Sequence, residues 1–285
     1  MNDPFRIEGP ALINFSGGRS SAMMLRRIHD AHGGRPPPDV HVVFANTGKE
    51  REETLDFVRD VEAHWGVPIH WIEYAGRDLR APIARAVIDG VTRLPHMEVT
   101  HATASRNGEP FARLIAEKRY LPNGVTRFCT QEMKITAGRD FMRALGYTEW
   151  ESLIGLRFDE ARRVANIRAS EHPAQWEPRM PLYDARITKA DVTAFWAASP
   201  FDLRLQWWES NCDGCYLKSA DILERIERDH PGTLAWWHAR EVERGATFQS
   251  HRSFASIISR ARLPTLPGVL NDPDDAGTIP CTCTE

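Results

Sequence analysis

The sequence lacks the features that mark several large classes of protein. No apolar run approaches the roughly 20 residues needed to cross a bilayer, and the opening MNDPFRIEGPALINF has no basic segment followed by an apolar one. These absences predict no signal peptide, no membrane partner and a cytoplasmic location. A net charge of −3 over 285 residues gives no global basic field, so any contact with nucleic acid would use a local patch.

Common metal and nucleotide motifs are also missing. The eleven histidines show no H-E-x-x-H spacing, and neither a Walker A sequence nor G-x-G-x-x-G occurs. Cysteine is scarce, with five residues at Cys129, Cys212, Cys215, Cys281 and Cys283. An odd count in a compartment expected to be reducing argues against a disulfide framework. Buried thiols, metal ligands and redox thiols remain as interpretations.

Apolar runs and helical patterns alternate along the first part of the chain. Strands are expected at 11–15, 40–46, 68–74 and 150–156, and helices at 20–34 and 50–66. This order predicts an α/β fold with a parallel sheet and right-handed crossovers. Further helices are expected at 132–146, 188–199, 219–232, 233–245 and 254–262. We therefore expect an α/β domain over 1–200 and a cysteine-containing helical region with a tail over 201–285.

The segment FSGGRSS joins the first expected strand to the first expected helix. The first amides of a helix lack internal partners and favour an anion. Gly17 and Gly18 would allow close backbone approach, and Ser16, Ser20 and Ser21 could add hydroxyl donors. Ordinary helix capping is the alternative, but a second polar loop, ANTGKEREET, follows the next strand. Both loops fall at the sheet edge where α/β proteins bind ligands.

Five motifs in order resemble one family. FSGGRSS resembles the PP-loop of ATP pyrophosphatases, and ANTGKEREET, RFCTQEMK and GLRFDEARR resemble segments of their phosphoadenosine phosphosulfate (PAPS) reductase branch. NCDGCYLK is similar to the cysteine pair of DndC-like members. The resemblance covers roughly residues 10 to 220. It implies a Rossmann-like parallel sheet of about five strands with helices on both faces, followed by a helical C-terminal region.

The resemblance also implies roles for individual residues. Arg157, Arg163 and Lys134 would act on phosphate as catalytic cations, whereas Arg162 could face solvent. Glu160 would orient arginines or hold Mg²⁺. The expected ATP-binding residues are Ser16, Gly17, Gly18, Arg19, Ser20, Ser21, Asn46, Thr47, Gly48 and Glu160. Two of them depart from the family pattern, because Ser20 and Asn46 stand at positions that are usually acidic.

Cys212 and Cys215 form a C-x-x-C pair, which alone is typical of zinc sites, iron–sulfur clusters and redox dithiols. Packed thiols are a further interpretation. The resemblance adds Cys129 and implies a [4Fe–4S] cluster, with zinc as the alternative metal. We expect Cys283 as the fourth ligand in preference to Cys281, or an open iron if neither binds.

The implied activity is adenylation of an acceptor by ATP, with release of pyrophosphate, followed by iron–sulfur-dependent sulfur transfer. Nucleic acid is one candidate acceptor, and a cysteine desulfurase is the expected sulfur donor. The sequence does not fix the oligomeric state, a homodimer being one option. A sulfonucleotide reductase or sulfotransferase is the first competitor, although the Glu-Cys-Gly segment of true PAPS reductases is missing. A non-catalytic nucleotide- and zinc-binding module is the second.

Overall fold

The computed structural model describes residues 3–76, 96–170 and 175–264, and its centre is a six-stranded sheet. The strands run in the order β4-β3-β2-β1-β5-β6. Their bounds are β1 Ala11–Asn14, β2 Val40–Asn46, β3 His70–Tyr74, β4 His96–Val99, β5 Trp150–Leu153 and β6 Trp176–Arg179. Five strands are parallel, as expected, and β4 adds an antiparallel edge beside β3.

The centre of the sheet places the loops that matter for function. Strand β1 lies between β2 and β5, and Ala11 pairs with Val40 on one side and Glu151 on the other. The three strands are parallel, so the chains that leave them emerge at one edge. The strand order reverses at β1, because β2 lies on one side of it and β5 on the other. In open α/β sheets, ligands usually bind beyond the carboxyl ends of the strands at such a point.

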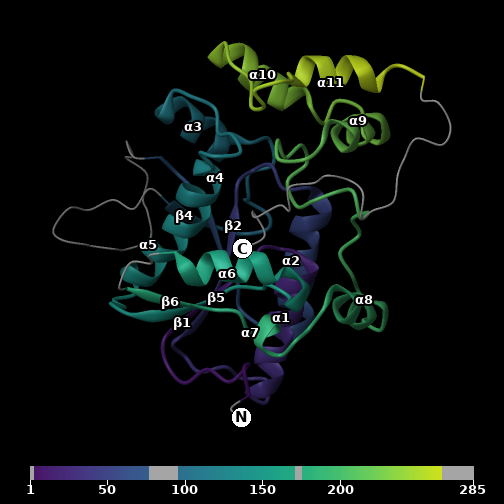
Figure 1. The fold of residues 1–285 in the computed structure, drawn as a ribbon. Coiled ribbons are helices and arrows are strands. Elements are labelled where there is room, and N and C mark those ends of the chain that lie inside the picture. Colours follow the sequence, from purple (N-terminus) through teal and green to yellow (C-terminus); the bar gives the residue numbers. More distant parts are fainter. Residues whose placement is uncertain (1–2, 77–95, 171–174, 265–285) are drawn as a thin grey trace.

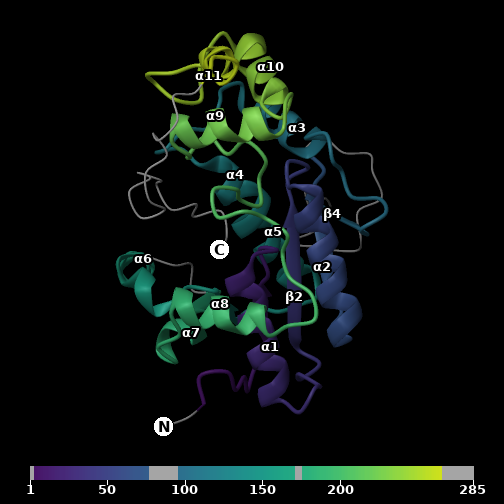
Figure 2. The same ribbon diagram turned by 90° about the vertical axis from the view of Figure 1, so that its right-hand side faces the viewer.

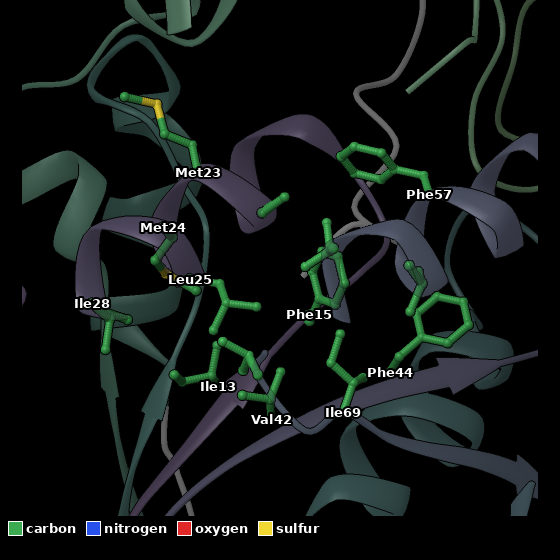
Figure 3. Packing of buried hydrophobic residues seen from close by; sticks show 14 of the residues in the cluster. Ile13, Phe15, Met23, Met24, Leu25, Ile28, Val42, Phe44, Phe57 and Ile69 are labelled. Atoms are coloured by element: carbon green, nitrogen blue, oxygen red, sulfur yellow. The ribbon is translucent and has the colours of Figure 1, made fainter. Parts of the chain in front are cut away.

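Helices cover both faces of the sheet, as predicted. Helices α1 (Arg19–Ala31), α2 (Glu52–Trp65) and α8 (Lys189–Ala197) lie on one face, and α5 (Thr136–Ala144) lies on the other. Figure 3 shows the first face, where Ile13, Phe15 and Phe44 pack with Met24 and Leu25 of α1. The alternate residues of β1 and β2 point to the second face, where Leu12 and Val43 pack with Phe141.

A second buried cluster holds the C-terminal helices. Helices α9 (Ala220–Asp229), α10 (Ala235–Arg244) and α11 (Phe254–Ala261) pack there with α3 (Glu109–Lys118) and α4 (Phe128–Thr130). Figures 1 and 2 show α9, α10 and α11 beside α3, at the end of the molecule opposite the N-terminus. Leu203 and Leu205 instead pack in the first core. The division at residue 200 therefore does not coincide with the division between the two buried clusters, and it stays a prediction.

Several elements differ from expectation. The helix expected at 132–146 begins as a π-helical turn, Gln131–Ile135, and becomes α-helical only at Thr136. Strand β6 was not predicted, because it is short, carries Pro178 and lies at the sheet edge where proline is tolerated. Helix α3 was missed because polar residues surround its start. The remaining short elements are the 3-10 turn Phe158–Glu160, α6 Ala161–Ala169 and α7 Pro181–Asp184.

Within the described residues, no helix has the length and hydropathy that crossing a membrane requires.

Candidate functional site

The loop between β1 and α1 has the geometry of an anion site. Gly18 is the extended residue before α1, no side chain caps the helix start, and its first turn contains no acidic residue. The Ser16 and Ser21 hydroxyls lie 2.8 Å apart, and the Ser21 hydroxyl lies 3.0 Å from the Gly18 carbonyl oxygen. The helix dipole and the uncapped amides favour an anion here.

The packing of the loop requires glycine at position 17, which the sequence analysis did not predict. Its φ is +75°, and an added Cβ would lie 2.7 Å from Cγ2 of Thr54 and 3.0 Å from the ring of Phe44. Glycine therefore lets the loop pack against α2 and β2, whatever it binds. An added Cβ at Gly18 would have its nearest contact 3.4 Å away, at the Ser16 hydroxyl. Gly18 is consequently the position where a substitution would alter the loop surface with little strain.

Gly155 contacts the first turn of α1, and the sequence analysis did not predict this contact. It follows β5, and its added Cβ would lie 2.8 Å from Cα and 3.0 Å from the amide nitrogen of Ser21. The GLR segment thus packs directly against the first turn of α1. Arg157 extends this contact, because its guanidinium donates to the Ser20 hydroxyl at 2.9 Å.

Glu160 joins the two arginines of the GLRFDEARR segment. It accepts a hydrogen bond from the Arg157 amide at 3.0 Å and forms an ion pair with the Arg163 guanidinium. Asp159 lies 3.0 Å from Nε of Arg157. Arg157 and Arg163 are therefore held by carboxylates, whereas the Arg162 residue is exposed. Glu160 serves here as an orienting group for arginine.

Arg19 is held outside the loop. Its guanidinium pairs with Asp202 at 2.7 Å and donates to the Leu203 carbonyl. These contacts tie the start of α1 to the segment after α8. They give Arg19 a structural role beside any role in ligand binding.

The loop after β2 is built from buried hydrogen bonds. Asn46 donates to Glu73 at 2.6 Å and to the Ser105 carbonyl at 2.9 Å, and its side-chain oxygen accepts from the Gly48 amide. Gly48 has φ of +77°. The Asn46 side chain thus holds this loop in shape through three hydrogen bonds. The motif alone did not indicate this role.

Glu50 is a further buried group that sequence reasoning did not identify. Its carboxylate accepts from the Thr47 amide at 2.7 Å and from the Thr47 hydroxyl at 2.8 Å. Burial raises the pKa of Glu50, against the opposing charge of Lys134 and the Thr47 hydrogen bonds. Its Oε1 lies 3.7 Å from Sγ of Cys212. The second loop therefore reaches the C-x-x-C turn.

The NCDGC turn connects the two loops. The Arg51 amide donates to the Asn211 carbonyl at 2.7 Å, and the Asp213 amide donates to the Lys49 carbonyl at 2.9 Å. The Asn211 side chain donates to the Ser16 carbonyl at 2.6 Å. A turn near residue 212 thus contacts both polar loops at the sheet edge. Only its place beside the cysteine pair pointed to Asn211 in the sequence, and this contact could not be predicted from it.

Three of the five cysteines lie in one buried cluster. Cys129, Cys212 and Cys215 are at most 8% exposed and belong to the second core. Sγ of Cys129, on α4, lies 3.3 Å from the hydroxyl of Tyr216, which follows Cys215. The structure therefore brings the cysteine of the RFCTQEMK segment to the C-x-x-C turn. Cys281 and Cys283 lie outside the described residues.

Lys134 lies on the π-helical turn and lines a cavity of about 470 Å³ together with Arg163. The cavity is lined by residues of β1, by β5 and β6, and by the segments from α4 to α5 and of α6. Lys134 and Arg163, two of the three expected catalytic cations, thus line the same cavity. The third, Arg157, lies against the loop before α1.

Another set of side chains has the spacing of a cation site but a different environment. Ligand atoms of Glu52, Asp56 and His101 lie within 4.8 Å of one another. Arg106 pairs with Glu52 at 2.8 Å and Arg59 pairs with Asp56 at 2.7 Å. These cations neutralise the carboxylates, so the set is a surface ion-pair network.

No family model matches the chain. The chain is 29% identical over 229 residues to the uncharacterized nin region protein ORF290 of Escherichia phage lambda, a match that covers 78% of this chain and 70% of that protein. A shorter match joins 22% of the chain to 12% of the uncharacterized protein MJ0066 of Methanocaldococcus jannaschii, at 44% identity over 64 residues.

Among solved structures, the chain is similar to the U34-tRNA thiolase NcsA from Methanococcus maripaludis with its [4Fe-4S] cluster. The TM-score is 0.37 at 14% identity, with 93% of this chain and 85% of that chain covered. A likeness of this size carries no argument, so the functional conclusion rests on the geometry of the site.

Proposed function

We propose that this chain is a PP-loop enzyme that uses ATP to adenylate an acceptor, releases pyrophosphate, and transfers sulfur to the activated acceptor, from which AMP leaves. One observation carries the proposal. The turn that holds Cys212 hydrogen-bonds through Asn211 to the uncapped loop at Ser16. The loop that we propose for ATP and a cluster of buried thiols therefore share a direct structural link.

ATP would bind through the loop from Ser16 to Ser21. The uncapped amides of α1 and its dipole would hold phosphate oxygens, and Arg157 would add positive charge, because it already contacts Ser20. Asn46, Thr47 and Gly48 would shape the neighbouring loop for the nucleoside. Mg²⁺ would bind mainly through the nucleotide's own phosphates, because Glu160 is engaged by Arg157 and Arg163.

In the proposed reaction, an acceptor oxygen attacks the α-phosphorus. The bond from this phosphorus to the oxygen bridging the α- and β-phosphates breaks, and pyrophosphate leaves with the electron pair. Arg157, Arg163 and Lys134 would stabilise the negative charge that develops on phosphate oxygens, which is the dominant catalytic effect in such transfers. The carboxylates of Asp159 and Glu160 would hold the two arginines in position.

The donor set fits an iron–sulfur cluster. Cys129, Cys212 and Cys215 offer three buried thiols from two segments, and cysteine thiolates are the usual ligands of such clusters. A bound [4Fe–4S] cluster would supply a centre that accepts and releases sulfur. We propose Cys283 as the fourth ligand of this cluster. Zinc is the alternative metal, because it would fit the same thiols in a closed site with a fourth ligand. The chain would then receive its sulfur from a donor protein such as a cysteine desulfurase.

A direct comparison of two nucleotides tests the proposal against the sulfonucleotide reductase. Anaerobically purified protein is incubated separately with ATP and with PAPS plus a thiol donor, and binding and sulfite release are measured. We expect ATP to bind and PAPS to yield no sulfite. Sulfite release from PAPS without ATP binding would replace adenylation with sulfonucleotide reduction.

A further inference from the structure

The cavity beside Lys134 is strongly basic. Four cationic side chains line it, and among the described lining residues there is no carboxylate; the four are Arg127, Lys134, Arg139 and Arg163. Arg139 is partly neutralised by Asp140 at 2.7 Å, and Arg163 pairs with Glu160. Within the described residues, Arg127 has no carboxylate partner. An anion entering the cavity would therefore meet a largely uncompensated positive charge on the Arg127 side.

The rest of the lining suits an aromatic ring with polar edges. Apolar side chains from the sheet form one wall, including Leu12 and Ile154, with Trp150 and Trp176 stacked at a centroid distance of 5.8 Å. Amide and hydroxyl groups that line the cavity are supplied by Asn14, Gln131, Ser152 and Asn166. Ligand pockets typically enclose roughly 300–1,000 Å³, and this cavity of about 470 Å³ falls in that range.

A chain of contacts and a charge interaction link the cavity to the proposed reaction site. Arg163 pairs with Glu160, which binds the Arg157 amide, and Arg157 contacts Ser20 of the ATP loop. On the other side, the charge of Lys134 acts on Glu50, which lies 3.7 Å from the Cys212 sulfur. The cavity is thus connected to both the nucleotide loop and the cysteines.

We propose that this cavity binds a nucleotide unit of the acceptor, separate from ATP, with its phosphate held by Arg127 and Arg139. The identification of the ligand as the acceptor rests on the proposed function, whereas the recognition of a nucleotide rests on the lining of the cavity. A free nucleotide and one nucleotide of a single strand share this chemistry.

The test uses UMP as a probe, with the ATP loop filled by saturating α,β-methylene ATP. Calorimetry measures UMP binding to the wild type and to Arg127→Gln, Arg127→Lys and Arg162→Gln. Loss of a charged hydrogen bond should weaken UMP binding by about tenfold or more in Arg127→Gln, and Arg127→Lys should retain most of the affinity. Arg162→Gln is the matched control, because Arg162 is exposed, lies on the same helix as Arg163 and does not line the cavity.

The outcomes separate this inference from the proposed function. Absence of UMP binding, equal binding to Arg127→Gln, or displacement of the ATP analogue by UMP would overturn the cavity assignment and leave the ATP proposal intact. Arg127-dependent UMP binding in a protein that fails to bind ATP would support the cavity and reject the proposed function. A uridine trinucleotide identifies the source: tighter Arg127-dependent binding than UMP indicates a strand, and weaker binding indicates a free nucleotide.

Discussion

The Asn211 side chain donates a hydrogen bond to the main-chain carbonyl of Ser16 across 2.6 Å, and these two residues are 195 positions apart in the sequence. Asn211 precedes the first cysteine of the C-x-x-C pair, and Ser16 begins the loop before α1. The contact therefore couples the two parts of the proposed reaction site. It also explains how a change at the cysteines could alter nucleotide binding.

Replacing Asn211 with alanine should weaken ATP binding. The loss of a buried hydrogen bond costs about 1–3 kcal/mol when its partner is left unsatisfied, so we expect roughly a tenfold loss of ATP affinity with the loop less fixed. Asn107→Ala is the control, because Asn107 is exposed and lies in a different loop. Calorimetry that gives equal ATP affinities for Asn211→Ala and wild type would show that the contact is structural only.

The two glycines of the loop should respond differently to valine. Gly17→Val would force a side chain against Thr54 at a φ that disfavours it, so we expect a lower unfolding temperature. Gly18→Val should fold like the wild type, because its φ is not left-handed and an added Cβ would make only ordinary contacts, 3.4 Å from the Ser16 hydroxyl and 3.6 Å from the Asn211 amide. It should lose most ATP affinity by covering the first amides of α1. Thermal unfolding and calorimetry on both variants check this. Undiminished ATP binding by folded Gly18→Val would place the nucleotide elsewhere.

The buried carboxyl of Glu241 should make stability depend on pH. Burial raises its pKa, opposed by hydrogen bonds from the amides of Phe254 and Phe248. A raised folded-state pKa means that the folded protein holds the proton more tightly than the unfolded chain. The free energy of unfolding should then fall as pH rises from the ordinary value of 4.5 through the folded pKa.

Glu241→Gln should lack this component of the pH dependence, even if its absolute stability is lower. Glu243→Gln is the control, because Glu243 is half-exposed on the same helix. Denaturant unfolding of the three proteins across this pH range measures the difference. Identical pH profiles for Glu241→Gln and wild type would show that Glu241 titrates normally in the fold.

The cysteine cluster should hold iron and acid-labile sulfide in protein purified without oxygen. Cys212→Ser and Cys129→Ser should each lose most of the iron, because a cluster requires its thiolates. Metal analysis that finds zinc and no iron would replace the iron–sulfur assignment.

A chain that ends at Pro280 tests the proposed tail ligand. Loss of iron, or a changed electron paramagnetic resonance signal, is expected if Cys283 is the fourth ligand. Unchanged iron content and an unchanged signal would show that three cysteines suffice and that the tail is passive.

The alternation of strands and helices predicted the sheet well, because the buried strands are apolar and each early helix has a clear amphipathic pattern. Helix α1 and strands β1 and β2 lie where the sequence places them. The edge strand β6 escaped prediction, because Trp176 and the charged residues around Pro178 give no apolar run. The π-helical turn at Lys134 also escaped, since its residues share the helical periodicity of α5.

Site residues that belong to a recognisable motif could be predicted from the sequence. Residues whose role depends on contacts between distant segments could not. The loop glycines, the arginines and the cysteines were visible in the sequence. The roles of Glu50 and Asn211 arise from contacts between segments more than 150 residues apart. The expected approach of a phosphate to Gly17 stays a prediction, and the structure adds that the missing side chain leaves room for Thr54.

The proposed function requires that ATP bound at the loop of residues 16–21 is cleaved between the α- and β-phosphates. The most direct measurement is product analysis after anaerobic incubation with ATP labelled at the α-phosphate, Mg²⁺, sulfide and single-stranded nucleic acid as acceptor. We expect AMP and pyrophosphate in equal amounts, with neither formed by Gly18→Val. Formation of ADP and orthophosphate by the wild type would contradict it.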